Sequence, residues 1–134
     1  MDYTIIDGAE HMTPEEVMRL LKQTYWANQR TLAQIEKSMR HSACYGIRHK
    51  ESGALVGFAR VITDWATTYY LCDVIIDAAH RGRGLGKALV AHIESQSEYA
   101  DLRGMLITRY AHALYQKFGY EVLNGRAMVK TLNC

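Results

Sequence analysis

Apolar residues recur at helical spacing in four stretches of this 134-residue chain. The segment Thr13–Glu16 places Thr as an N-cap, Pro in the first turn and Glu three residues after the cap, which predicts a helix start with a capping box. A second helix is predicted over residues 31–40, and a third carries Leu85, Leu89, His92 and Ile93 on one face. A fourth helix is predicted over residues 111–118, because a glycine follows that is well placed to end it.

β-Prone runs bounded by turn residues lie between these helices. The predicted strands cover residues 3–6, 44–48, 54–63, 69–76, 105–108, 120–123 and 128–132. The second and third form an antiparallel hairpin, and the last two form a closing hairpin through Asn124-Gly125. Residues 69–76 alternate less than the others, which predicts a central strand buried on both faces.

The resulting order, β-α-α-β-β-β-α-β-α-β-β, predicts a mixed α+β fold. No internal repeat or linker interrupts it, and the chain has a single proline. Hydrophobic residues make up 49% of the chain and charged residues 22%, which is ordinary for a globular protein. Residues 1–134 are therefore expected to form one domain with one core.

The charge balance and the cysteines narrow the classes of partner. Sixteen Lys and Arg against 14 Asp and Glu leave a net charge of +2, too balanced to indicate a nucleic-acid binder by charge alone. No apolar run approaches the roughly 20 residues of a membrane helix, and the first residues lack a secretion signal. Cys44, Cys72 and Cys134 are too scattered for a disulfide framework or a CxxC-type zinc site. We therefore expect a cytoplasmic protein with no nucleic-acid, membrane or metal partner.

A glycine-rich turn, Arg81–Lys87, follows a predicted strand and opens a predicted helix. Backbone N–H groups at a helix start bind anions, and the glycines remove side chains that would block the approach. The turn also carries three cations that suit a diphosphate, although a tight strand–helix connection is the simpler alternative. A P-loop would need Ser or Thr where Ala88 stands, and the glycines are spaced GxGxG rather than GxGxxG. Neither nucleotide motif fits.

The same turn resembles the R/Q-x-x-G-x-G/A signature of the GNAT superfamily of acetyl-CoA-dependent N-acetyltransferases. The segment Leu71–Ile76 resembles that family's central strand, and Ala111–Tyr120 resembles its A-x-x-LY-x-K-x-GF segment. The order of elements agrees as well, so the resemblance covers nearly the whole chain. It implies a mixed, mostly antiparallel central sheet flanked by about four helices.

The resemblance also implies acetyl-CoA as co-substrate, with no metal. The diphosphate would lie on the glycine-rich turn, and the pantetheine arm would pair with the backbone of the preceding strand. The implied cofactor-binding residues are Val74, Ile75, Ile76, Arg81, Gly82, Arg83, Gly84, Leu85, Gly86, Lys87 and Thr108. Two positions depart from the family pattern, because many relatives carry Asn at Thr108 and Pro at Ala78.

Acetyl transfer to an amine requires an oxyanion site, an acid for the departing thiolate and removal of a proton from the amine. A free N–H near Val74 or Ile75 would stabilise the oxyanion, a contribution of roughly 3–4 kcal/mol. By resemblance, Tyr115 is the candidate general acid, with an ordinary core tyrosine as the alternative. Asp73 is the candidate acceptor of the amine proton, and a structural ion pair is an equal alternative.

The acceptor is expected to be a small-molecule or peptide amine. Five aromatic residues are candidates for its pocket, with a core role as the alternative for each: Tyr25, Trp26, Trp65, Tyr69 and Tyr70. Arg60, Asp64 and His112 are weaker site candidates. Members of the family are often dimers, so a homodimer stays open. The competing functions are a non-catalytic CoA-binding sensor or interaction module, and nucleotide binding by the glycine-rich turn.

Overall fold

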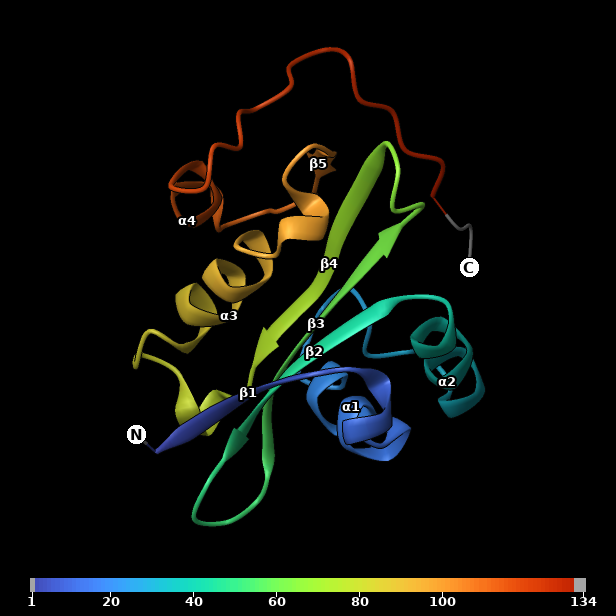
Figure 1. Ribbon diagram of the computed structural model, residues 1–134. Helices are drawn as coiled ribbons and strands as arrows, with labels where there is room; N and C mark the ends of the chain where they lie inside the picture. Colours follow the sequence, from blue (N-terminus) through green and yellow to red (C-terminus); the bar gives the residue numbers. More distant parts are fainter. Residues whose placement is uncertain (1, 132–134) are drawn as a thin grey trace.

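The computed structural model describes residues 2–131, which fold around one five-stranded sheet (Figure 1). The strands are β1 (Tyr3–Asp7), β2 (Ala43–His49), β3 (Leu55–Thr63), β4 (Thr68–Ile76) and β5 (Arg103–Met105), and the helices are α1 (Pro14–Leu21), α2 (Leu32–Arg40), α3 (Leu85–Glu94) and α4 (His112–Gln116). The spatial order is β1-β2-β3-β4-β5; only the β4–β5 pair is parallel. The predicted mixed, mostly antiparallel α+β fold is confirmed. Within these residues no helix is long and apolar enough to cross a membrane.

The helices cover both faces of the sheet and bury two cores. On one face, α1 and α2 pack over β-strand side chains that include Phe58 and Ile75. On the other face, α3 and α4 pack over a larger cluster that includes Leu71 and Tyr115. The predicted capping box at Thr13 is formed, with the Glu16 N–H donating to the Thr13 hydroxyl at 3.1 Å. Helices therefore cover both faces of the sheet, and its strand ends and edges remain accessible for a functional site.

Strand β4 contains a bulge in its middle. Phe58 pairs with Ile75 and Arg60 pairs with Cys72, so β4 advances three residues where β3 advances two. The extra residue sits at Asp73, whose φ of 56° lies in the left-handed region that side chains other than glycine rarely adopt. Buried and half-buried residues alternate along β4 and none of them is exposed, which agrees with a central strand covered on both faces. The bulge shifts the facing of the side chains, since Leu71 before it and Val74 after it both pack in the cluster under α3 and α4.

Two predictions at the C-terminal end need correction. The strand predicted over residues 105–108 is β5 at Arg103–Met105, because this stretch pairs with the start of β4. The predicted closing hairpin is not formed within the described residues: Asn124-Gly125 lies in a turn, but residues 120–123 and 128–131 are not strands. Residue 132 lies outside the described residues. Two strand arms without a third strand to pair with are marginal in water, and neither arm pairs with β5 in the described residues.

Candidate functional site

Strands β4 and β5 are paired at one end only. β5 pairs with Thr68, Tyr69 and Tyr70, whereas no strand in residues 2–131 pairs with this edge of β4 from Leu71 to Ile76. Apart from the Ile76 carbonyl, which accepts from the Arg81 side chain, the main-chain groups on that edge can bind an extended ligand that carries amides. Val74, Ile75 and Ile76, the residues expected beside a pantetheine arm, lie in this half of the strand. The bulge at Asp73 stands where the paired and unpaired halves meet.

The glycine-rich turn lies directly beyond this open edge and leads into α3. Gly84 is the N-cap of α3 in the left-handed conformation (φ 75°), and no side chain in residues 2–131 caps the helix start. The first N–H groups of the helix, at Leu85, Gly86 and Lys87, therefore face outward without intrahelical partners. A helix start of this kind attracts an anion through those N–H groups and the helix dipole.

The turn combines open space with fixed cations. A Cβ built at Gly82 or Gly84 would meet nothing within 4 Å, and both residues have positive φ. The Arg81 side chain turns back to the strand, where its Nε donates to the Ile76 carbonyl at 3.0 Å. The Arg83 Nη1 donates to the Tyr3 hydroxyl at 2.6 Å, so strand β1 orders this guanidinium. The turn can accept a diphosphate because its surface is main chain and its cations are placed around it.

Tyr115 and Thr108 line a cavity next to β5. Tyr115, on α4, is 8% exposed and packs in the same core as Val74, Ile76 and Leu85. Burial, and then the charge of Glu94, raises the pKa of its hydroxyl. No other group in residues 2–131 hydrogen-bonds that hydroxyl, which lines a cavity of about 560 Å³. The Thr108 hydroxyl accepts from the Ala111 N–H at 3.0 Å, which leaves its own proton free to donate.

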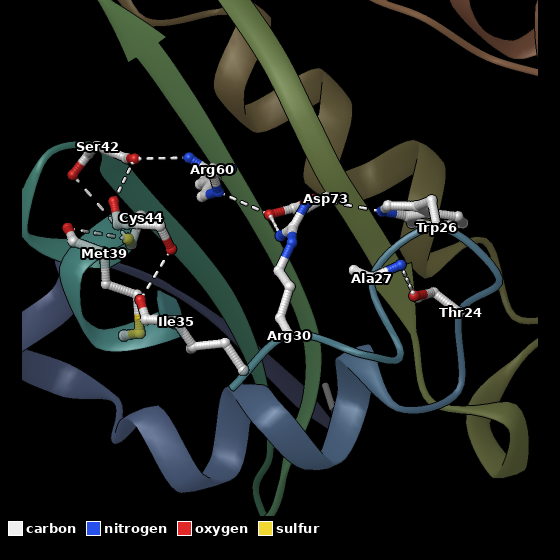
Figure 2. A network of polar contacts seen from close by, with 11 residues as sticks. Thr24, Trp26, Ala27, Arg30, Ile35, Met39, Ser42, Cys44, Arg60 and Asp73 are labelled. Carbon is white, nitrogen blue, oxygen red and sulfur yellow. Dashed lines mark hydrogen bonds and ion pairs between the residues drawn. The ribbon is translucent and has the colours of Figure 1, made fainter. Parts of the chain in front are cut away.

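Asp73 is the centre of a buried ion-pair network on the opposite face of β4 (Figure 2). Its carboxylate accepts from Arg30 Nη1 at 2.6 Å, from Arg60 Nε at 2.6 Å and from Trp26 Nε1 at 3.2 Å. The Asp73 side chain is 2% exposed. Burial alone would raise the pKa of Asp73, but the hydrogen bond from Arg30 and the charge of Arg60 outweigh it and lower the pKa. These contacts match the structural ion pair that the sequence left open.

The network holds the loop between α1 and α2 against the bulge and continues into an aromatic wall. Trp26 contacts Tyr25 edge to face at 5.0 Å between ring centroids, and Tyr25 contacts Tyr110 at 6.5 Å. The Arg109 guanidinium lies 4.5 Å from the centre of the Tyr25 ring. We call Tyr25, Trp26, Arg109 and Tyr110, together with the Asp73 network, the vestibule. Two separate loops meet there, and its aromatic side chains are exposed.

Comparisons with known proteins decide the family. The sequence profile of the acetyltransferase (GNAT) family matches residues 10–120. The chain belongs to the GNAT family. A Xanthomonas campestris pv. campestris protein assigned to the same family is 33% identical, with 97% of this chain and 93% of that chain covered and a TM-score of 0.88.

Two further comparisons are more limited, one in the length matched and one in sequence identity. The uncharacterised N-acetyltransferase ycf52 of Gracilaria tenuistipitata var. liui is 42% identical over 48 residues, which is 36% of this chain and 26% of the relative. The matched part thus spans about a quarter of that curated relative. AAC(6')-Iy, whose structure is known in complex with the bisubstrate analogue CoA-S-monomethyl-acetylneamine, shares the fold. Its sequence is 20% identical to this chain, and the two structures align over 100% of both chains with a TM-score of 0.68.

Contacts within this GNAT fold hold several predicted site residues. Trp65 stacks on Tyr99 at the turn between β3 and β4. The Thr67 hydroxyl donates to Asp64, which also accepts three backbone N–H groups within its own turn, and these hydrogen bonds lower the pKa of Asp64. The Tyr69 hydroxyl donates to Glu94. The cavity lined by Tyr115 is also lined by Tyr69, Tyr70 and His112, which is exposed at the start of α4.

Sequence reasoning missed Arg30, Arg109 and Tyr110. Each lies in a loop, and only the fold brings these residues beside β4. The one sequence signal for this part of the site was Trp26, because a large aromatic residue in a predicted loop is not explained by packing in the core. Burial raises the pKa of Cys72 to about 12, and Asp73 adds to this against the opposing charge of Arg60, so this thiol stays protonated at neutral pH. Within residues 2–131 no cluster of His, Cys, Asp and Glu could hold a metal ion.

Proposed function

We propose that this GNAT chain transfers the acetyl group of acetyl-CoA to an amine acceptor by direct attack in a ternary complex. The observation that carries the proposal is the half-paired β4–β5 edge next to the glycine-rich turn. The open main-chain edge suits the two amides of a pantetheine arm, and the turn suits a diphosphate. The residues that would hold the co-substrate are Val74, Ile75, Ile76, Arg81–Lys87 and Thr108.

The bulge would supply the oxyanion site. Since Asp73 turns the strand out of its regular path, an N–H that follows it, at Val74 or Ile75, is available to a developing negative charge. Such a donor contributes roughly 3–4 kcal/mol to the transition state of acyl transfer. Tyr115 would protonate the departing thiolate, because burial of its side chain keeps the proton on its hydroxyl at neutral pH and no group in the described chain hydrogen-bonds that hydroxyl.

The electrostatics of the vestibule would assist deprotonation of the acceptor. Arg30 and Arg60 pair with one carboxylate, Asp73, and Arg109 lies over the Tyr25 ring, so the vestibule carries an excess of positive charge. Positive charges nearby lower the pKa of an amine and increase the fraction of the neutral nucleophile. Because Asp73 is already bound by two arginines, we assign it to positioning of the vestibule and the bulge rather than to accepting the proton.

Gly84→Asp should abolish acetyl-CoA binding. The substitution places a side chain and a negative charge where the diphosphate would lie, at a residue with φ 75° and open space around it. Gly53→Asp is the matched control, because Gly53 has φ 74° and equally open surroundings in the β2–β3 turn. Binding is measured by calorimetry and by the rise in melting temperature with CoA and acetyl-CoA. If Gly84→Asp bound acetyl-CoA as tightly as Gly53→Asp, the assignment of the turn would be wrong.

Release of free thiol distinguishes the enzyme from a CoA-binding sensor. Thiol is followed with acetyl-CoA alone and after addition of amines from a panel. An enzyme releases thiol at a rate that depends on the amine, whereas a sensor binds CoA without amine-dependent release. Stabilisation by ATP or NAD in place of CoA would instead indicate nucleotide binding by the turn.

Amines that carry an anionic group should be the better acceptors in this panel. The excess of arginine charge in the vestibule favours a carboxylate near the amine, and the aromatic wall favours an apolar body. Phenylalanine and phenylalaninamide form a suitable pair, since only the first carries a carboxylate; because the amide also lowers the pKa of the neighbouring amine, KM is compared at a pH above the pKa of both amines. We expect a lower KM for phenylalanine and loss of this preference in Arg109→Gln. Equal KM values for the pair would contradict the anion preference without affecting the assignment of the CoA site.

A further inference from the structure

A cluster of aromatic and imidazole rings lies beside the glycine-rich turn. Tyr3 on β1, His49 on β2 and His80, directly before the turn, pack together with ring centroids between 5.2 and 5.7 Å apart. All three residues are half-buried. Arg83, in the turn itself, reaches them through its hydrogen bond to the Tyr3 hydroxyl. We call these four residues the imidazole cluster.

The Tyr3 hydroxyl joins the turn to His80. It accepts from Arg83 Nη1 at 2.6 Å, because a guanidinium has protons to donate and no lone pair to offer. The one proton of the hydroxyl is then left for His80, whose Nδ1 lies 2.8 Å away. Nδ1 accepts that proton only when it carries none of its own, so this arrangement assigns a neutral His80 ring with its proton on Nε2.

The groups that face His80 include no carboxylate that pairs with it. Strand β1 contributes Tyr3, β2 contributes His49, and the turn contributes Arg83 through Tyr3. No ion pair within residues 2–131 involves either imidazole of the cluster. Asp77 turns its carboxylate to an arginine of α1, at 3.0 Å. A proton added to His80 would therefore place a second cation on the oxygen that already holds Arg83.

We propose that Tyr3 and His80 position Arg83 for a phosphate group of the co-substrate, and that His80 takes up a proton when this phosphate binds. The inference rests on the proposed function and extends its binding site to two residues that precede the turn. The hydrogen bond to Tyr3 uses one N–H of Arg83 and leaves the others for phosphate oxygens. Because the guanidinium is already ordered, less side-chain entropy is lost on binding.

Proton uptake follows from the charges in the cluster. In the free protein a protonated His80 is repelled by Arg83, and Arg81 beside it adds a further positive charge. A phosphate at Arg83 offsets this repulsion and favours the charged imidazole, whose Nδ1 then donates to the second lone pair of the Tyr3 oxygen. A binding step that takes up a proton is opposed as protons become scarce, so affinity should fall as the pH rises.

Calorimetry of dephospho-CoA binding tests the proton uptake. This ligand keeps the diphosphate and lacks the 3′-phosphate, which itself titrates near neutral pH. The difference in binding heat between buffers of low and high ionisation enthalpy gives the protons taken up. We expect uptake at pH 7 and about tenfold weaker binding at pH 8 than at pH 6. His80→Gln should bind without uptake and without this pH dependence. His41→Gln is the matched control, because His41 is exposed at the end of α2 and should not affect the uptake.

The same titration with CoA identifies the phosphate. A difference in uptake between wild type and His80→Gln that appears with CoA alone would place the 3′-phosphate at Arg83, and one that appears with both ligands would place the diphosphate there. A wild type that binds both ligands with the same proton uptake as His80→Gln would overturn the proposal and leave the proposed function intact.

Tyr3→Phe tests the positioning of Arg83, since it keeps the ring and removes the oxygen. We expect the Kd for dephospho-CoA to rise by about three- to tenfold. Arg83→Gln should raise it at least as much, and adding Tyr3→Phe to Arg83→Gln should have no further effect. A Tyr3→Phe variant that binds like wild type, or whose effect persists in full without Arg83, would contradict the positioning.

Nuclear magnetic resonance of the ¹⁵N-labelled His80 ring gives a readout that does not depend on CoA. In the free protein at pH 7 we expect the proton on Nε2, and saturation with inorganic pyrophosphate should add a proton at Nδ1. A His80 ring that is unchanged by pyrophosphate and by both CoA ligands would overturn the uptake. Loss of CoA binding in wild type would instead contradict the proposed function.

Discussion

Tyr115→Phe is expected to lower the turnover number for acetyl transfer by roughly ten- to a thousandfold while acetyl-CoA binding is retained. The change removes one hydroxyl and keeps the ring, which is 8% exposed and packed in the core. The hydroxyl has no partner in the described chain, so its removal leaves no buried group unsatisfied. Thiol release is measured in single-turnover experiments, where chemistry rather than product release is observed.

Tyr120→Phe is the matched control for this experiment. The Tyr120 ring lies 6.1 Å from that of Tyr115, and its hydroxyl donates to Glu94 at 2.7 Å. Its loss should therefore reduce stability and leave the single-turnover rate unchanged. An unchanged rate in Tyr115→Phe would rule out the acid. An equal fall in acetyl-CoA affinity would mean that Tyr115 contributes to binding instead.

Asp73→Asn should reduce the free energy of unfolding by about 3–5 kcal/mol, because two arginines would share a buried site without their counterion. Arg60 and Arg30 are only 12% and 29% exposed in their side chains, so water replaces the lost carboxylate poorly. Urea unfolding at pH 7 measures the effect. Asp7→Asn is the control. Asp7 pairs with His92 and its side chain is half exposed, and exposed ion pairs contribute about 1 kcal/mol or less to the free energy of unfolding. Adding Arg60→Gln to Asp73→Asn should recover part of the loss.

The pH dependence of Asp73→Asn checks the same assignment. The lowered pKa of Asp73 means that its contribution is present above the ordinary value of 3.8 and is lost as the pH falls through the lower native value. The stability gap between wild type and Asp73→Asn should therefore narrow when unfolding is repeated near pH 3. In folded protein the deficit in acetyl transfer should stay constant as the pH rises above neutral. A deficit that shrinks at high pH would restore Asp73 as the acceptor of the amine proton.

The elements that position the cofactor site could be predicted from sequence because their signals are local. Thr13 and Glu16 fix a helix start within one turn of chain, and the three glycines between Arg81 and Lys87 determine a backbone shape by themselves. The bulge at Asp73 could not be predicted, since it depends on the register of β4 against β3. An aspartate also gives no sequence signal for a positive φ.

The vestibule and the structure of the C-terminal segment could not be predicted from the sequence, because both depend on contacts between distant parts of the chain. Arg30 and Asp73 are 43 residues apart in the chain, and only the packing of the α1–α2 loop on the sheet brings them into contact. Residues 120–131 have the local pattern of a hairpin, yet a strand forms only where an edge is within reach, and in the described chain the segment arches past β5. A pattern gives the preference of a segment; the location of its partner is a property of the whole fold.

The open edge of β4 also bears on how this protein tolerates mutation. In the proposed function, cofactor recognition there would rest on main-chain groups, whose positions depend on the bulge and on the strand rather than on particular side chains. Substitutions at Val74 or Ile76 that still pack in the core would leave that recognition intact. The vestibule is built from side chains on two loops, so a single substitution can alter its charge or shape. Acceptor choice can therefore drift while use of the co-substrate is conserved.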